Sequence, residues 1–165
     1  GMDPQHRYWF PIIGYNYRMT NMQAAIGLAQ LERIEWFIER RREVAGWYDA
    51  ALKSLPVLRP AEAAWAKNSY WLYSICVDEE TDRDLLMSDL LARGIETRPF
   101  FYPMHQMPPY LDPAHATYPV ATGLAAQGLS LPSSANLSKQ DVAWIASMLE
   151  ECLEKQCGEK MSCRR

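Results

Sequence analysis

A helical pattern that begins at Thr20 and continues to Ser54 is the feature that most constrains the fold of this chain. Thr20 as N-cap and Gln23 three residues later match a capping box, in which each residue satisfies a backbone N–H of the other. Apolar residues then recur at spacings of three, four and seven along one helix face, until Pro56 ends the pattern. We therefore predict a helix over residues 20–54, with Gly46 as the expected place for a break.

The rest of the chain carries shorter patterns that alternate between strand and helix periodicity. In chain order they predict a buried strand at 68–78, a helix at 82–93 capped by Thr81 and ended by Gly94, a strand that Pro99 cuts short, a proline-rich loop at 103–119, a helical piece at 121–127, a short strand at 129–132 and an amphipathic helix from Ser138 to about Lys155. This order favours an α+β fold, in which a long N-terminal helix and further helices pack on one side of a small, mostly antiparallel sheet.

Composition limits the partners and the organisation of the chain. With 48% hydrophobic and 22% charged residues it is typical of a globular protein, and its net charge of −3 argues against nucleic acid as a partner. No apolar run reaches the length of a membrane span, so we expect no membrane partner. We expect an N-terminal segment at 1–13, in which Gly1 is a tag remnant, a single domain at 14–155, and a disordered tail at 156–165.

The four cysteines give no sign of a metal site. Cys76 lies in an apolar run, and Cys152, Cys157 and Cys163 have a C-x4-C-x5-C spacing without a nearby histidine. We expect four reduced thiols and, from them, a cytoplasmic protein.

A first candidate site lies at Gly14-Tyr15-Asn16-Tyr17-Arg18, directly before the long helix. Asn16 and Arg18 offer hydrogen-bond donors suited to a phosphate, and the N–H groups at a helix start also favour anions. The alternative, which the residues alone favour slightly, is that these side chains satisfy local backbone groups while the tyrosines pack in a core.

A second candidate site lies within Thr97–Tyr110, "TRPFFYPMHQMPPY". Aromatic faces at Phe100 and Tyr102 can stack on a base or a sugar, Arg98 can pair with a diphosphate, and His105 can donate a hydrogen bond to the same ligand. The alternative is a hydrophobic loop that covers the edge of the sheet. The residues alone do not decide between these interpretations.

The chain contains no complete catalytic set. It lacks the glycine-rich phosphate motifs, the H-E-x-x-H zinc motif and the G-x-S-x-G nucleophile elbow. Its five lysines lie in polar contexts that do not suit a lysine of lowered pKa, which Schiff-base chemistry requires. These are Lys53, Lys67, Lys139, Lys155 and Lys160.

Three segments carry a family resemblance. "GYNYRMTNMQAAIGLAQLERI", "GIETRPFFYPMHQMPPY" and "LSLPSSANLSKQDV" resemble, in this order, segments of the DegT/StrS family of sugar aminotransferases, and specifically its perosamine-synthase-like members. These are pyridoxal-phosphate enzymes with the aspartate-aminotransferase fold that aminate a 4-keto sugar linked to a nucleotide. The resemblance spans about Tyr8 to Leu153 and implies the C-terminal small domain of that fold.

The resemblance also implies roles for individual residues. Asn16, with Tyr15 and Arg18 beside it, matches the asparagine that reaches the coenzyme phosphate of the other subunit. Phe100, Tyr102 and His105, with Arg98, match the loop that contacts the nucleotide-sugar. The family's Schiff-base lysine and most of its phosphate site belong to an N-terminal part that this chain lacks. We therefore expect no catalytic residue here, no binding of pyridoxal phosphate by this chain alone, and no activity alone.

Three hypotheses follow for the function. The chain is one part of a split or truncated aminotransferase, it is a non-catalytic binding or dimerisation module, or it is a remnant without function. The expected partners are a second copy of the chain or a missing N-terminal large-domain partner, and a nucleotide-sugar is the expected ligand.

Overall fold

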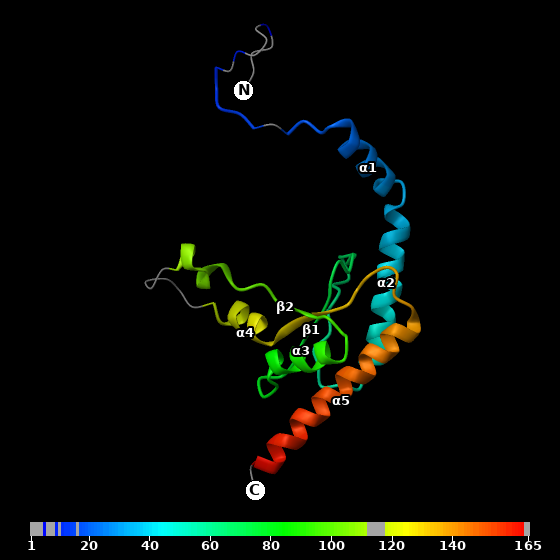
Figure 1. Cartoon of the computed structure of the whole chain (residues 1–165), viewed down its shortest axis with the longest axis vertical. Coiled ribbons are helices and arrows are strands. Elements are labelled where there is room, and N and C mark those ends of the chain that lie inside the picture. Colours follow the sequence, from blue (N-terminus) through cyan, green and yellow to red (C-terminus); the bar gives the residue numbers. More distant parts are fainter. Residues whose placement is uncertain (1–4, 6–8, 10, 16, 112–117, 164–165) are drawn as a thin grey trace. The chain divides into compact units, whose positions relative to one another are not determined.

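The computed structural model describes residues 5, 9, 11–15, 17–111 and 118–163. Contacts divide the chain into two compact units, Gly1–Trp36 and Phe37–Arg165 (Figure 1). This division lies further along the chain than the expected boundary after residue 13.

The first unit contains helix α1, Asn21–Leu31, which starts where the sequence predicts. Thr20 is the N-cap, and its side chain and that of Gln23 form the complete capping box. None of the residues of α1 is buried. The helix ends in a tight turn, in which the Arg33 N–H donates to the Gln30 carbonyl at 3.1 Å.

The prediction of one helix with a break near Gly46 was wrong about the position of the break. Helix α2 spans Ile34–Ala51, so the two helices separate at Glu32 and Arg33. Gly46 lies inside α2, and a Cβ added there would meet nothing within 4 Å. The Arg33 N–H bonds the carbonyl three residues back, at Gln30, and this turn interrupts the helix although neither Glu32 nor Arg33 is a glycine or a proline.

The second unit contains a three-stranded antiparallel sheet in the order β1-β3-β2. Its strands are β1 at Tyr73–Cys76, β2 at Arg98–Pro99 and β3 at Gly128–Leu131. Strand β1 is shorter than the predicted 68–78. Tyr70 has φ at 46°, a left-handed conformation that an extended strand cannot contain, so pairing starts after it.

Three helical segments pack on one face of this sheet, which confirms the predicted fold class (Figure 1). They are the second half of α2, helix α3 at Arg83–Ala92 and helix α5 at Lys139–Cys163. Alternate strand residues supply the sheet's side of the core, and the helices supply apolar residues at helical spacing. The core includes Val44, Tyr48, Leu52, Tyr73, Ile75, Leu86, Leu90, Leu129, Leu131, Val142, Ile145, Leu149 and Cys152.

Helix α3 agrees with its predicted range but not with its predicted cap. The side chain of Asp82, not that of Thr81, accepts the backbone N–H of Leu85 at 2.9 Å. The Thr81 hydroxyl instead donates to Asp78 at 2.7 Å. Gly94 follows the helix with φ at 80°, the left-handed conformation in which glycine ends a helix without steric cost.

Helix α5 starts as predicted and extends further. The Ser138 hydroxyl accepts the Asp141 N–H at 3.1 Å, and the Asp141 carboxylate accepts the Ser138 N–H at 2.7 Å. The helix continues to Cys163, where the sequence predicts a disordered tail from residue 156. Gln156 is buried and exchanges two hydrogen bonds of 3.1 Å with the Asp82 backbone, which holds the added turn against the start of α3.

An arm leaves the sheet between β2 and β3, and we define it as the described residues between Phe100 and Gln127. It contains two 3-10 turns, η1 at Met104–Gln106 and η2 at Pro108–Tyr110, and helix α4 at Pro119–Gln127. Helix α4 begins two residues before the predicted piece at 121–127, because proline is well suited to a first helical position.

No described helix is both long and apolar enough to cross a membrane. No group of three or more potential ligands for a metal ion occurs among the described residues.

Candidate functional site

The residues around the predicted phosphate contact are exposed in the first unit. Tyr15 and Tyr17 are 80% and 87% exposed, and their rings lie 5.9 Å apart in a tilted arrangement. Arg18 is also exposed, two residues before the N-cap of α1. Asn16, the central residue of this prediction, lies outside the described residues. The exposure of Tyr15 and Tyr17 contradicts the part of the alternative interpretation that packs the tyrosines in a core.

Arg98 lies on the open face of the sheet, which the helices leave uncovered. The register places Ser74, Ser130 and Arg98 side by side across the three strands. The two serine hydroxyls bond to each other at 2.9 Å. Among the described residues, the Arg98 guanidinium has no hydrogen bond or ion pair, and Arg98 is exposed. The open face therefore presents the Arg98 cation beside the two hydroxyls of Ser74 and Ser130, which are bonded to each other.

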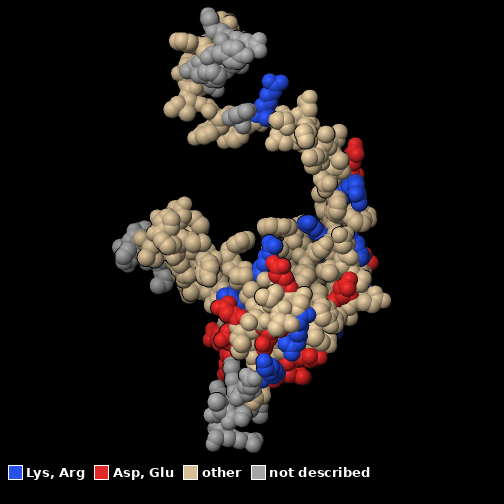
Figure 2. Space-filling model, in the orientation of Figure 1, with Lys and Arg blue, Asp and Glu red and all other residues tan. Residues whose placement is uncertain are grey.

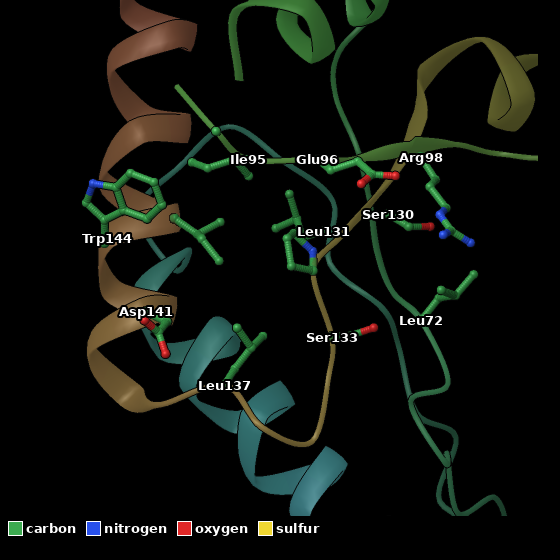
Figure 3. Close-up of a pocket in the computed structure, with 13 residues that line it drawn as sticks. Leu72, Ile95, Glu96, Arg98, Ser130, Leu131, Ser133, Leu137, Asp141 and Trp144 are labelled. Atoms are coloured by element: carbon green, nitrogen blue, oxygen red, sulfur yellow. The ribbon is translucent and has the colours of Figure 1, made fainter. Parts of the chain in front are cut away.

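A cavity of about 520 Å³ opens beside Arg98, at the end of β3 (Figure 3). Leu131 and Leu137 give it an apolar wall, Trp144 borders it from α5, and Glu96 and Arg98 lie on the strand side. The sequence did not identify Trp144, which lies 46 positions after Arg98 and reaches the cavity only through the packing of α5. Its lining includes the Trp144 indole and the Arg98 guanidinium, which lie on opposite sides of Leu131 in Figure 3, and the carboxylates of Glu96 and Asp141.

Two other polar groups of the cavity, Ser133 and Asp141, are already engaged in the fold. The Ser133 hydroxyl donates to the Trp71 carbonyl at 3.2 Å. The Asp141 carboxylate accepts hydrogen bonds from the hydroxyl and from the backbone N–H of Ser138. These bonds, the hydroxyl bond most of all, hold the pKa of the Asp141 carboxyl below its usual value. A carboxylate held in a helix cap is a poor general base.

The aromatic loop divides into a part held on the sheet and a part exposed beyond it. The Phe100 N–H donates to the Gly128 carbonyl at 3.0 Å, and its ring lies over Gly128. Tyr102 is 66% exposed. Further along, the His105 ring lies 4.9 Å from the Tyr118 ring. The structure thus joins Phe100 to β3, and His105 to the start of α4.

Two of the neighbours of His105 were not predicted. The Tyr118 ring lies tilted against the His105 ring, and the Nε2 atom of His105 lies 3.5 Å from the Thr122 hydroxyl. Tyr118 is the N-cap of α4 and Thr122 lies within it, and both follow His105 by more than ten residues. No local sequence pattern therefore predicts these contacts. Among the described contacts, none brings His105 against Arg98 or Tyr102.

The arm exposes many apolar side chains and very little charge. Asp112 is the one Lys, Arg, Asp or Glu between Pro99 and Ser138 in the sequence. The described arm is accordingly tan in Figure 2, without the blue and red of the rest of the unit. Exposed aromatic and aliphatic residues of the arm include Phe101, Tyr102, Met104, Tyr110, Leu111, Tyr118 and Val120. Such a surface suits contact with a ligand or a further protein part.

Of the three described thiols, two are buried, at Cys76 and Cys152, and the third, at Cys157, is exposed. Burial raises the pKa of the Cys76 and Cys152 thiols, which leaves them protonated and unreactive near neutral pH. The described lysine side chains, which are Lys53, Lys67, Lys139 and Lys155, are all exposed.

Three comparisons place the chain among known proteins. Residues 1–150 match the model of the DegT/DnrJ/EryC1/StrS aminotransferase family. The chain is 45% identical to the GDP-perosamine synthase of Caulobacter vibrioides over 157 residues, which are 93% of this chain and 42% of that protein. It is 41% identical to the GDP-perosamine synthase of Escherichia coli O157:H7, over 92% of this chain and 41% of that protein.

A solved structure shows the same relation. The chain superposes on Helicobacter pylori PseC, an aminotransferase involved in the biosynthesis of pseudoaminic acid, with a TM-score of 0.80 and 29% identity. The match covers 87% of this chain and 40% of that one. The chain thus spans about two fifths of the length of these relatives, and it corresponds to their C-terminal part. It belongs to the DegT/DnrJ/EryC1/StrS aminotransferase family.

Proposed function

We propose that this chain is the C-terminal part of a nucleotide-sugar aminotransferase of the perosamine-synthase kind, and that its role is to bind the nucleotide-sugar. The chemistry would be amination of a 4-keto sugar with pyridoxal phosphate, a coenzyme that supplies an electron sink when bound. The similarity to two GDP-perosamine synthases over nearly the whole chain supports this proposal most directly.

Within this role, the open face of the sheet and the arm would form the nucleotide-sugar side of the site. Arg98 offers a cation to the diphosphate, and the aromatic rings of Phe100 and Tyr102 offer faces for a base or a sugar. His105, steadied by Tyr118, offers a hydrogen bond. In the first unit, Asn16 with Tyr15 and Arg18 would contact the coenzyme phosphate of a second subunit.

We expect that this chain alone does not hold the whole coenzyme. Each lysine with a described side chain is exposed, so we assign no Schiff-base role to it and expect no turnover from this chain alone. The partner would be the N-terminal large domain of the family, in an oligomer. The free thiols of Cys76, Cys152 and Cys157 are consistent with a cytoplasmic location, which we also propose.

An amination assay tests this proposal. The chain is mixed with a separately produced N-terminal part of the Caulobacter relative, and a GDP-linked 4-keto sugar and glutamate are supplied. We expect no product from either part alone and glutamate-dependent amination from the pair. The variant Arg98→Gln in the pair should raise KM for the nucleotide-sugar, because it removes the cation without removing the side chain's bulk.

Controls give the assay a clear outcome. A mass measurement establishes whether the pair assembles. Arg59→Gln is the matched control, because the described bonds of Arg59 go to the carbonyl and the carboxylate of Asp49, and neither residue lines the cavity. This control should leave KM unchanged. Assembly of the pair without any amination would contradict the proposal.

A second function, a non-catalytic dimerisation module, is favoured by one specific observation. Helix α1 carries Met22, Ile26, Leu28 and Leu31, which are between 59% and 76% exposed. Apolar helix residues at this exposure are typical of a surface that another protein covers. A stable dimer that binds no nucleotide-sugar would favour this function over the first.

A further inference from the structure

Gly128 begins β3 at the point where the arm returns to the sheet, and the Phe100 ring takes the place of the side chain that Gly128 lacks. A Cβ built on Gly128 would lie against the ring carbons Cγ, Cδ1 and Cδ2 of Phe100, closer than Cβ atoms approach other atoms in folded proteins. An aromatic ring packed over a glycine on a neighbouring strand is a known way of stabilising a sheet at such a residue. Any larger residue at this position would have to displace the ring.

Phe100 is also the first residue of the arm, at the point where the arm leaves the sheet. The backbone N–H of Phe100 donates to the Gly128 carbonyl at 3.0 Å, and β2 ends at Pro99. Phe101 and Tyr102, the next two residues, are 80% and 66% exposed. The position of Phe100 therefore sets the direction in which the segment with Tyr102 and His105 leaves the sheet.

Arg83 holds the same point of the arm from the helical side. Its guanidinium donates to the Gly128 carbonyl at 2.8 Å and to the Ala125 carbonyl at 3.1 Å. The Arg83 side chain is only 10% exposed, and its Nε bonds Asp84 at 2.6 Å. Ala125 lies in the last turn of α4, where carbonyls have no partner inside the helix. One buried cation thus ties the end of α4 to the start of β3.

The far part of the arm contacts helix α4. Thr122 of α4 lies 3.5 Å from His105 and 3.3 Å from the Gln106 side-chain nitrogen. The arm is therefore held where it leaves the sheet by Gly128 and Phe100 and further out by α4, and Arg83 connects these two supports.

We propose that Gly128 and Arg83 are positioning residues for the nucleotide-sugar site. Gly128 gives the Phe100 ring its seat, Arg83 fixes that seat relative to α4, and together they place Tyr102 and His105. The positioning itself rests on the contacts above, and only its consequence for ligand binding rests on the proposed function.

The first experiment needs no ligand. Chymotrypsin cleaves after aromatic residues, so its rate of cutting within residues 100–118 under native conditions reports how firmly the arm is held. Gly128→Ala should raise this rate at least about fivefold, because overpacking forces the ring out of its seat. Gly123→Ala is the matched control, since it adds the same methyl group in α4, where a Cβ meets nothing within 4 Å. It should leave the rate unchanged or lower it.

A double-variant cycle tests whether the effect passes through the ring. Measured at the cut after Tyr110, which every variant keeps, Phe100→Ala alone should also loosen the arm. Gly128→Ala should add little in the Phe100→Ala background, because the clash is gone. The double variant also serves if Gly128→Ala alone does not fold. Additive effects of the two substitutions, or equal rates for Gly128→Ala and Gly123→Ala, would overturn the proposal.

The second experiment measures the affinity of the chain for GDP. Gly128→Ala and Arg83→Gln should each weaken it by about tenfold, and Gly123→Ala should match the wild type. Arg83→Lys should restore part of the affinity, because an ammonium can still bond one of the two carbonyls. Unchanged affinity in Gly128→Ala would contradict the positioning role. Absence of GDP binding in the wild type would instead count against the proposed function, while the cleavage cycle decides the positioning.

Discussion

Helices α1 and α5 begin in the same way and are stabilised differently. Each has a capping box, Thr20 with Gln23 in α1 and Ser138 with Asp141 in α5. Helix α1 buries none of its residues, whereas α5 buries a row of apolar residues at helical spacing against the sheet. A cap determines where a helix begins. Its stability in the protein depends on the surface that its apolar face covers, and none of the described residues of α1 is buried.

The largest expected contrast comes from truncating one apolar side chain in each helix. Leu149 in α5 is fully buried, so Leu149→Ala should lower the free energy of unfolding by about 2–5 kcal/mol. Ile26 in α1 is 64% exposed, and Ile26→Ala should change it by less than about 0.5 kcal/mol. Urea unfolding of both variants checks this, and similar losses at the two sites would break the comparison.

A smaller contrast separates the tyrosines of the two units. The Tyr73 hydroxyl donates to the Asp49 carboxylate at 2.6 Å, and its buried ring stacks on Tyr48 at 4.7 Å. Tyr73→Phe should therefore lower the free energy of unfolding by about 1–2 kcal/mol, through the lost hydrogen bond to a charged group. Tyr17 is 87% exposed, and Tyr17→Phe should have no measurable effect. Thermal unfolding of the two variants compares them directly.

The two caps themselves give the next contrast. Ser138→Ala should lower the free energy of global unfolding by about 1 kcal/mol, because α5 belongs to the core. Thr20→Ala should leave global unfolding unchanged within about 0.5 kcal/mol, because α1 contributes no buried residue to it. The loss of the Thr20 cap should instead appear as faster amide exchange confined to Asn21–Leu31. A global loss from Thr20→Ala would show that α1 is part of the core.

The smallest effect is a dependence on pH at the α5 cap. Hydrogen bonds from Ser138 lower the pKa of Asp141 below its ordinary value of 3.8. A carboxyl whose pKa is lowered by folding adds stability that is complete above its unfolded pKa and is lost as the pH falls through its folded pKa. Asp141→Asn should therefore be less stable than the wild type at neutral pH, and the difference should shrink in acid below about pH 4. A difference that grows in acid would contradict this assignment.

Local signals in the sequence predicted the parts of the fold that depend on a few neighbouring residues. Both capping boxes, the buried face of α5 and the glycine that ends α3 follow from spacing and backbone chemistry. The break at Glu32 and Arg33 could not be predicted, because no glycine or proline marks it. The length of α5 depends on Gln156 bonding Asp82, a contact between residues 74 positions apart.

For the candidate site, the residue types at Arg98, Phe100 and His105 left a ligand contact and a covering loop both open, and only the family resemblance favoured the nucleotide-sugar, which stays a prediction. The partners of these residues could not be predicted, because they depend on strand register and helix packing. Ser130 beside Arg98, Gly128 beneath Phe100, and Tyr118 beside His105 all come from later segments.

Amide hydrogen exchange is the measurement that tests most directly whether this chain is one part of a larger aminotransferase. In the chain alone, we predict that α5 and the core half of α2 exchange slowly and that α1 exchanges faster by at least about tenfold. After assembly with the N-terminal part of the Caulobacter relative, α1 should become protected, while α5 changes little. Protection of α1 equal to that of α5 in the isolated chain, or an α1 that remains unprotected in an assembled pair, would contradict this account.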